Sequence, residues 1–517
     1  MIRRTISYHK TMKPIAKAVM TITVFNVVER ALGFLFKIYL SREIGAVGMG
    51  IYSVATSFFF VLLTLIVSGV PLVVSKLTAK DKSNSGGVCS AALIVELIAS
   101  VAICLLTLAL NKPIGSLFAE RESMTLVLIM LPAIVFSGVY SSFRGVLWGE
   151  KKFASVSIVE LIEQVARILV CIVLFLVAGS NIRAVALSMV IACAVSAGAC
   201  TIFYFAGRRR LKSPRTHFKP LLSSSVPITL SRTTSSVNGY LTAIAIPFLL
   251  MSTGLNSEQS MYVFGSCVGM ALPLLYMPIT VVGSLAFVMI PTLSTSYAQN
   301  DKKSTCSQIQ NALTFSIIVA AIALPVLASL GDEIGILLYD NADAGMFLKK
   351  SAWLLIPLSF ENIASSMLNS LDLEKKSLIN YLIGAAAMYI VCFCFYSRFN
   401  MDIYMIAFGL SLVLSSVLDI IDIKRRTGFK LTFLRPLITC LVAAYPSWLL
   451  TEFVSGLIQN GILSMIVSAV GGAAFMALLA VIFGAVDFEI HIGKRRKRAR
   501  KNLLPGPRLA RKRKSSA

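Results

Sequence analysis

The sequence is poor in charged residues and in histidine, and both shortages argue against a soluble enzyme. Only 14% of its 517 residues are charged and 56% are hydrophobic, whereas a typical soluble domain has about 25% charged residues. The three histidines lie outside the long apolar segments, the ten cysteines are scattered, and no Walker motif is present. We therefore expect neither an enzyme nor a bound cofactor or metal.

Long apolar runs take the place of these missing features. Each run covers about 20–28 residues, enough for a helix to cross ~30 Å of hydrocarbon. The runs are continuous rather than alternating, which favours helices over barrel strands. The sequence thus predicts an all-α polytopic membrane protein with about 14 transmembrane helices. We expect them near 15–39, 49–73, 87–110, 123–147, 154–178, 184–206, 221–250, 262–290, 307–330, 347–370, 378–397, 402–423, 433–453 and 461–486.

Basic and acidic residues gather in different loops. Segment 207–220 holds six Lys or Arg residues, whereas 331–343 holds four Asp or Glu residues and no Lys or Arg. Because Lys and Arg are enriched in cytoplasmic loops, the pattern predicts a bacterial cytoplasmic-membrane protein with both termini in the cytoplasm. The segment after residue 487 holds twelve of the 49 Lys and Arg residues. We expect this tail to rest on anionic lipids rather than to bind nucleic acid.

A series of sequence marks occurs twice in the chain. IGSLFA at 114–119 and IGILLY at 334–339 are each followed by a proline-containing apolar run and then by Glu-Lys-Lys, at 150–152 and 374–376. The offset corresponds to six predicted helices, so both copies share one orientation. The pattern favours two pseudo-symmetric six-helix lobes around a central site; chance matching of short apolar strings is the alternative. The predicted divisions are an N-lobe at 1–206, a basic cytoplasmic linker at 207–220, a C-lobe at 221–427, two further helices at 428–487 and a basic cytoplasmic tail at 488–517.

Basic side chains inside the apolar runs are candidate ligands for cargo, because charge in hydrocarbon is costly and marks function by default. Arg30 and Arg232 lie deep in the first helix of each repeat, where two guanidinium groups suit a phosphate or pyrophosphate. Lys37 and Arg144 are further candidates, although both lie near helix ends and can reach the interface instead. The alternative is that Arg30 and Arg232 each pair with a glutamate of another helix.

The acidic side chains are candidates for ion coupling or for charge pairing. Glu163 and Arg167 are four residues apart and can neutralise each other on one helix face. Glu29 points about 100° away from Arg30, so it need not cancel that charge. Glu361 is the candidate in the second repeat. The other acidic residues in the apolar runs are Glu96, Glu160, Asp419 and Asp422.

Three segments carry a family resemblance. They read ERALGFLFKIYLSREIGAVGMGIYS at 29–53, SGVPLVVSKLTA at 68–79 and FRGVLWGEKKF at 143–153. They resemble the polysaccharide-transporter branch of the multidrug/oligosaccharidyl-lipid/polysaccharide (MOP) exporter superfamily, which includes stage V sporulation proteins and adjoins the MurJ-type lipid flippases. The resemblance implies two six-helix lobes, alternating access and an undecaprenyl-pyrophosphate-linked sugar as cargo.

The resemblance also assigns individual residues. Arg30, in its Arg-x-x-Gly context, matches a first-helix arginine that lines the cavity of MurJ-type flippases, and Lys37 stands near a second basic position. Those relatives carry further cavity arginines in helices 2 and 8, where this chain has none. That difference argues against lipid II in particular, not against an anionic lipid-linked glycan.

The function we expect is that of a monomeric flippase for a polyprenyl-pyrophosphate-linked saccharide, either a peptidoglycan precursor or another envelope glycan. Its driving force would be the membrane potential or an ion gradient, since no nucleotide site is visible. A cation-coupled multidrug antiporter of the same superfamily and a non-transporting scaffold for envelope or spore assembly are the alternatives.

Overall fold

The computed structural model describes residues 2–457 and 461–483, and every regular element in those two ranges is a helix. The basic tail predicted at 488–517, with its expected lipid contacts, lies outside the described residues. Side-chain caps start several helices, since Asn181, Asn341 and Asn400 each accept a hydrogen bond from a backbone amide two or three residues ahead. The helices are α1 (Ile2–Val67), α2 (Val70–Lys80), η1 (Lys82–Asn84), α3 (Ser85–Ala109), α4 (Asn111–Gly115), α5 (Arg121–Gly149), α6 (Phe153–Ala178), α7 (Ile182–Ala206), α8 (Phe218–Ser252), α9 (Ser257–Phe264), η2 (Gly265–Ala271), α10 (Leu272–Leu275), α11 (Met277–Ala298), α12 (Lys302–Tyr339), α13 (Ala342–Ser351), η3 (Ala352–Leu354), α14 (Leu355–Ser370), α15 (Glu374–Cys394), η4 (Tyr396–Arg398), α16 (Met401–Thr427), α17 (Leu434–Leu457) and α18 (Gly461–Ile482).

The predicted helical membrane protein is confirmed, but the count of fourteen spans is not. Within the described residues, eleven helices are long and apolar enough to cross a membrane, or twelve if the bent pair Ser257–Leu275 and Met277–Ala286 forms one span. Two predicted spans fall in α1 and α2, where the only backbone break inside α1 is at Gly45, with φ 65°. Another falls on α13, η3 and α14, and α14 alone has only 16 residues, too few for about 30 Å of hydrocarbon.

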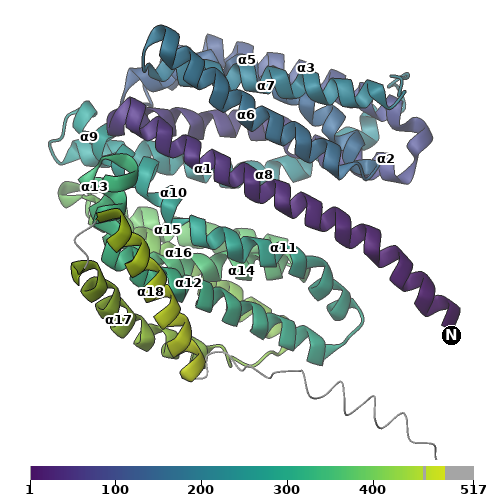
Figure 1. The fold of residues 1–517 in the computed structure, drawn as a ribbon. Coiled ribbons are helices and arrows are strands. Elements are labelled where there is room, and N and C mark those ends of the chain that lie inside the picture. Colours follow the sequence, from purple (N-terminus) through teal and green to yellow (C-terminus); the bar gives the residue numbers. More distant parts are fainter. Residues whose placement is uncertain (1, 458–460, 484–517) are drawn as a thin grey trace, which may run out of the picture.

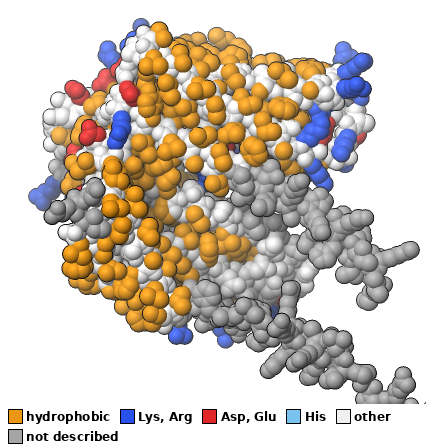
Figure 2. Space-filling model, viewed as in Figure 1, with side chains coloured by type: hydrophobic (Ala, Val, Ile, Leu, Met, Phe, Trp, Pro, Cys, Tyr) orange, Lys and Arg blue, Asp and Glu red, His pale blue; other side chains and the backbone are white. Residues whose placement is uncertain are grey.

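The outer surface of the helices is apolar. Leu176 and Val177 are each 81% exposed, and many other large hydrophobic side chains also face outward. Figure 2 shows hydrophobic side chains covering most of one face, with Lys and Arg at both ends of the upper helices and few charged side chains between them. A soluble monomer rarely exposes so large an apolar surface, so this surface fits contact with lipid.

The helices form two bundles with α8 between them (Figure 1). The first bundle contains α1 to α7, where α5 packs against α1, α2, α3 and α7. The second contains α9 to α18, where α12 packs against α11, α13, α14, α17 and α18. Helix α8 packs extensively along α1 and also touches α2, α3 and α9. It therefore lies against the first bundle over much of its length and reaches the second.

The two ends of the molecule differ in how the bundles meet. We call the end with the connection 207–217 the linker end, and the end with Gly45 the far end. At the far end, a β-carbon on Gly265 of η2 would lie 1.9 Å from the carbonyl oxygen of Ala46. Similarly, one on Gly50 would lie 2.3 Å from the carbonyl oxygen of Met261. These glycines thus allow the backbone of α1 to touch those of α9 and η2 across the two bundles.

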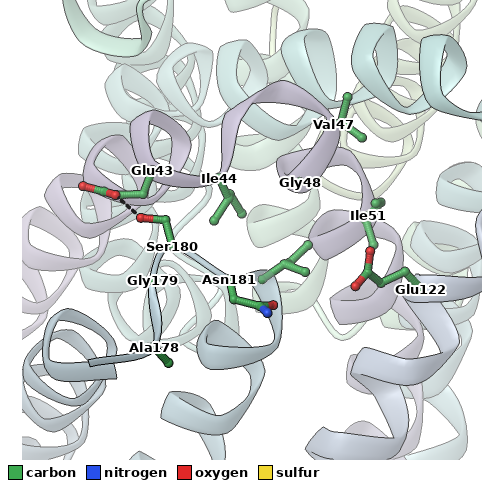
Figure 3. Close-up of a pocket in the computed structure, with 11 residues that line it drawn as sticks. Glu43, Ile44, Val47, Gly48, Ile51, Glu122, Ala178, Gly179, Ser180 and Asn181 are labelled. Carbon is green, nitrogen blue, oxygen red and sulfur yellow. Dashed lines mark hydrogen bonds between the residues drawn. The ribbon is translucent and has the colours of Figure 1, made fainter. Parts of the chain in front are cut away.

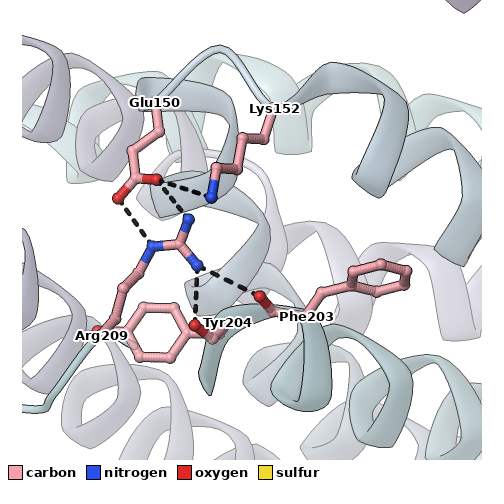
Figure 4. A network of polar contacts seen from close by, with 5 residues as sticks. All are labelled: Glu150, Lys152, Phe203, Tyr204 and Arg209. Atoms are coloured by element: carbon pink, nitrogen blue, oxygen red, sulfur yellow. Dashed lines mark hydrogen bonds and ion pairs between the residues drawn. The ribbon is translucent and has the colours of Figure 1, made fainter. Parts of the chain in front are cut away.

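The connection 207–217 is fastened to the linker end of the first bundle (Figure 4). The Arg209 guanidinium donates to both carboxylate oxygens of Glu150, with Nε 2.8 Å from Oε1, and to the carbonyl oxygens of Phe203 and Tyr204. Further along, Lys212 donates to the carbonyl oxygen of Ser83 at 2.7 Å. Arg209 is 8% exposed in its side chain, so the start of α8 is held on the first bundle by a buried clamp.

This clamp predicts a pH-dependent stability. The hydrogen bonds from Arg209 hold the pKa of Glu150 below its usual range. A lowered pKa stabilises the fold above the ordinary glutamate value, and that stabilisation is lost as pH falls through the lowered value. Glu150→Gln should therefore cost on the order of 2 kcal/mol of unfolding free energy at pH 7. The difference from wild type should shrink below about pH 4, as measured by thermal unfolding in detergent.

Lys152→Gln is the matched control, because the Lys152 ammonium lies 3.7 Å from the same carboxylate and its side chain is 46% exposed. It should change the melting temperature little at any pH. A Glu150→Gln difference that stays constant between pH 7 and acid would contradict the clamp.

Candidate functional site

The candidate site is a polar cavity of about 230 Å³ inside the first bundle. Helices α1, α5 and α6 line it. Four of the residues singled out in the sequence, Glu29, Arg144, Glu163 and Arg167, meet in this cavity. The complete lining is Glu29, Leu63, Val67, Ser137, Tyr140, Ser141, Arg144, Glu160, Glu163, Gln164 and Arg167.

Arg144 is held by its own helix and by α6. Its guanidinium lies 5.2 Å from the ring centre of Tyr140 and 4.5 Å from that of Trp148, one turn to either side. One Nη1–Oε1 contact of 3.5 Å joins it to Glu160, whose carboxylate also accepts a hydrogen bond from the Tyr140 hydroxyl. The side chain is therefore fixed inside the cavity by aromatic and ionic contacts rather than extended toward the interface.

The predicted pairing of Glu163 with Arg167 is confirmed. Nη2 of Arg167 lies 2.6 Å from Oε1 of Glu163, and Nη1 approaches Oε1 of Gln164 at 3.5 Å. Glu29 lines the same cavity from α1. The Nε atoms of Arg144 and Arg167 have no hydrogen-bond partner within the described part of the chain. The cavity thus holds three carboxylates, two guanidinium groups and two unused donors.

A fourth carboxylate lies behind the cavity on α3. Glu96 is 1% exposed, and its two carboxylate oxygens accept hydrogen bonds from the hydroxyls of Ser141 and Ser142 on α5. It forms no ion pair with any described residue. Glu96 therefore ties α3 to the wall of the cavity through neutral hydroxyl donors, which can satisfy a carboxyl group in a low-dielectric interior.

Arg30, Lys37 and Arg232 lie outside this cavity. Arg30 and Arg232 are exposed and Lys37 is half-buried, and none of the three forms an ion pair with a described residue. Arg30 and Lys37 are seven residues apart, so they share one face of α1. The alternative that Arg30 and Arg232 are neutralised by glutamates of other helices finds no support in the described residues.

Helical spacing puts the exposed Arg232 on the same side of α8 as residues that contact the first bundle. On the same face, the Ser236 hydroxyl lies 2.9 Å from that of Thr64, and a β-carbon on Gly69 would lie 2.4 Å from the Ser225 carbonyl oxygen. Positions 225, 232 and 236 share a helix face because they are separated by two turns and by one turn. Arg232 thus faces the half of the molecule that carries Arg30.

The second bundle places its acidic residues apart from the cavity. Glu361 on α14 is half-buried and makes no ion pair with a described residue. Asp419 is 2% exposed and accepts a hydrogen bond from the Asn380 amide at 2.8 Å, and that amide also reaches Asp422, which pairs with Lys376 at 2.6 Å. The structure therefore does not bring Glu361 together with Glu29, Glu163 or Arg167.

Two further pockets open at the far end, one in each bundle. The first, of about 580 Å³, lies between α1, α5 and the α6–α7 turn, where Ser180 donates to Glu43 (Figure 3). The second, of about 370 Å³, lies between α8, α13 and the α15–α16 turn, beside the Lys350–Asp402 pair. Neither contains any of the candidate residues from the sequence.

The sequence analysis assigned no functional role to Glu160, Tyr140 or Gln164, although all three line the cavity. A spacing signal was available for two of them, since Glu160 and Gln164 lie one or two turns from Arg167 and share its helix face. Tyr140 lies one turn before Arg144 in the same way. Their pairing across helices depends on how α5 packs against α6, which a single sequence does not reveal.

Solved structures share this arrangement of helices. A lipid II flippase MurJ in an inward closed conformation superposes with a TM-score of 0.71 at 16% identity, covering 90% of this chain and 98% of that one. An inward-facing multidrug resistance MATE family transporter of the MOP superfamily gives 0.65 at 15% identity, covering 80% and 98%. The fold is that of MOP-superfamily membrane transporters.

Sequence comparison identifies the family within that class. Residues 15–297 match the family described as "Polysaccharide biosynthesis protein", and the chain belongs to it. Stage V sporulation protein B of Bacillus subtilis is 23% identical over 389 residues, covering 71% of this chain and 75% of that protein. Lipid II flippase MurJ of the same organism is 21% identical over 521 residues, covering 88% and 93%. The family resemblance expected from the sequence motifs is confirmed.

The cavity generates a prediction about charge balance. Arg167→Gln removes the partner of Glu163 and leaves that carboxylate beside Glu29 and Glu160. We expect a loss on the order of 1–3 kcal/mol in unfolding free energy, less than for a fully buried pair because both side chains keep partial exposure. The double variant Glu163→Gln/Arg167→Gln should recover part of this loss, as measured by melting temperatures in detergent.

Lys350→Gln is the control for a similar but exposed ion pair, that of Lys350 with Asp402 at 3.1 Å. It should shift the melting temperature much less than Arg167→Gln. If the double variant loses as much stability as the sum of the two single substitutions, Glu163 and Arg167 are not coupled.

Proposed function

We propose that this protein is a flippase that moves a polyprenyl-pyrophosphate-linked saccharide from the inner to the outer leaflet of a bacterial cytoplasmic membrane. The cargo class would be a peptidoglycan precursor or another envelope glycan. The fold and the family support the proposal, since the similar proteins include a stage V sporulation protein and a lipid II flippase. The two bundles would serve as the lobes of an alternating-access cycle.

Arg30 is the observation that carries the proposal. It lies on α1, fifteen residues before Gly45, which is about 22 Å along the helix and inside the candidate span that begins at Val27. Its side chain is exposed, and no described carboxylate pairs with it. An unpaired guanidinium within an apolar span is a candidate ligand for an anion, and a pyrophosphate supplies one. Arg232, on the α8 face turned toward the first bundle, would supply the second guanidinium.

The direction of transport follows from the proposed orientation. Lys and Arg residues of the connection 207–217 and of the turns before α3 and α6 lie at the linker end, so we place this end in the cytoplasm. The described helices also meet across the two bundles at the far end, as expected for a carrier that is closed to the outside. A negative interior would favour outward movement of an anionic cargo by about 2.3 kcal/mol per charge per 100 mV.

The cavity with Glu29, Glu163 and Arg167 would place charged groups beside α1 without neutralising the Arg30 guanidinium. We assign these residues to charge pairing or ion coupling, and Arg144, fixed by Tyr140 and Trp148, to the wall of the cargo path. These assignments keep the pyrophosphate on Arg30 and Arg232.

Arg30→Ala tests the proposal. In a strain that depends on this protein, the variant should cause a lipid-linked glycan to accumulate in the inner leaflet at normal protein levels, because the pyrophosphate loses a charged ligand. Leaflet-resolved lipid extraction measures the accumulation. Arg121→Ala, which removes an exposed arginine at the far end, is the control and should cause none.

The alternatives give different results. Drug resistance on overexpression without glycan accumulation on depletion would indicate the cation-coupled antiporter. Normal growth with Arg30→Ala, together with a defect only when the whole protein is absent, would indicate the scaffold. Either result would overturn the flippase.

A further inference from the structure

Arg42 joins the two bundles at the far end. It lies on α1, three residues before the break at Gly45, and its guanidinium crosses to the end of α12 in the second bundle. Nε donates to the carbonyl oxygen of Leu338 at 2.8 Å, and Nη2 donates to that of Leu337. One side chain of the first bundle thus holds two consecutive backbone carbonyls of the second.

These carbonyls need a partner from outside their helix. The last four carbonyls of a helix have no intrahelical donor, and α12 ends at Tyr339. The backbone amides that close its end, those of Asp340 and Asn341, donate to Ile336 and Gly335. The carbonyls of Leu337, Leu338 and Tyr339 are left over, and Arg42 takes the first two. A cation at a helix C-terminus is also favoured by the helix dipole. Arg42 therefore caps α12 from the opposite bundle.

We propose that Arg42 is a latch that holds the far end closed and releases when it opens. The inference rests on the proposed alternating-access cycle. Separation of the bundles at this end would move Arg42 away from α12 and break both hydrogen bonds, which water would replace only in part. The latch thus stabilises only the closed state. A ligand or contact that favours one state shifts the populations by its differential free energy.

Other contacts also join the two bundles at the far end. Ser257 on α9 donates to the Ala119 carbonyl oxygen at 2.8 Å and to Glu120 at 2.7 Å, and the backbones at Ala46 and Gly265 touch. These contacts are short-range and depend on close approach. Arg42 has the longest reach among them, so it is the contact that can capture the partner bundle before the backbones meet.

The experiment measures far-end distance in the full chain in lipid nanodiscs. Spin labels are introduced through unnatural amino acids at Lys112 and Glu258, two exposed positions on opposite bundles, which leaves the ten native cysteines in place. Arg42→Gln should raise the long-distance, open population about tenfold relative to wild type. Arg42→Lys should give an intermediate shift, because an ammonium cannot hold both carbonyls as the guanidinium fork does.

Two further variants keep the result interpretable. Arg183→Gln removes an arginine at the same end whose partner, Glu122 at 3.5 Å, belongs to the same bundle, so it should leave the distances unchanged. Gly265→Ala forces the backbones apart and should open the far end independently of the latch. If Gly265→Ala opens the far end and Arg42→Gln does not, or if Arg183→Gln opens it equally, the latch is wrong. The measurement needs no cargo, so its outcome is separate from that of the glycan test.

Discussion

Hydrocarbon leaves a charged side chain few partners, and most of this structure follows from how its few intramembrane charges are satisfied. Arg167 and Glu163 neutralise each other along α6, Arg144 is held by two aromatic rings and Glu160, and Glu96 relies on serine hydroxyls. The contacts of Arg144 and Glu96 also fasten one helix to another, α5 to α6 and α3 to α5. Arg30, like Lys37 and Arg232, has no such partner among the described residues.

The two bundles are joined unequally along their length. A hydrophobic cluster containing Ile51, Phe59, Met261 and Phe347 crosses from one bundle to the other near the far end. Toward the linker end, the contact between halves passes largely through α8, whose Leu221 belongs to a core cluster of the first bundle. The first helix after the linker is thus shared between the halves. A rearrangement of the bundles must bend or slide α8, and Pro227 and Pro247 lie inside it.

The sequence predicted the fold class well because a membrane imposes long apolar helices, and the family because its motifs are local. It also predicted the Glu163–Arg167 pair, which depends only on helical spacing. The number of spans was predicted less well than the fold class. Hydropathy did not reveal that the run 347–370 divides into shorter helices, of which α14 has only 16 residues. It also did not reveal that the run 15–39 and most of the run 49–73 are joined in one helix, broken only at Gly45. The cavity was not predictable as a unit, since Glu29, Tyr140 and Glu160 meet only through the packing of three helices. The roles of Arg30 and Arg232 remain predictions.

The docked linker has a consequence for the order in which the protein is made. Every group that fastens it, from Ser83 and Glu150 to Phe203 and Tyr204, precedes Arg209 or Lys212 in the chain. The first bundle can therefore close its own end as soon as the ribosome has delivered the linker, before any helix of the second bundle has entered the membrane. When α8 is inserted, its N-terminal end is already held at a fixed position, and the second bundle assembles against a first bundle that has already folded.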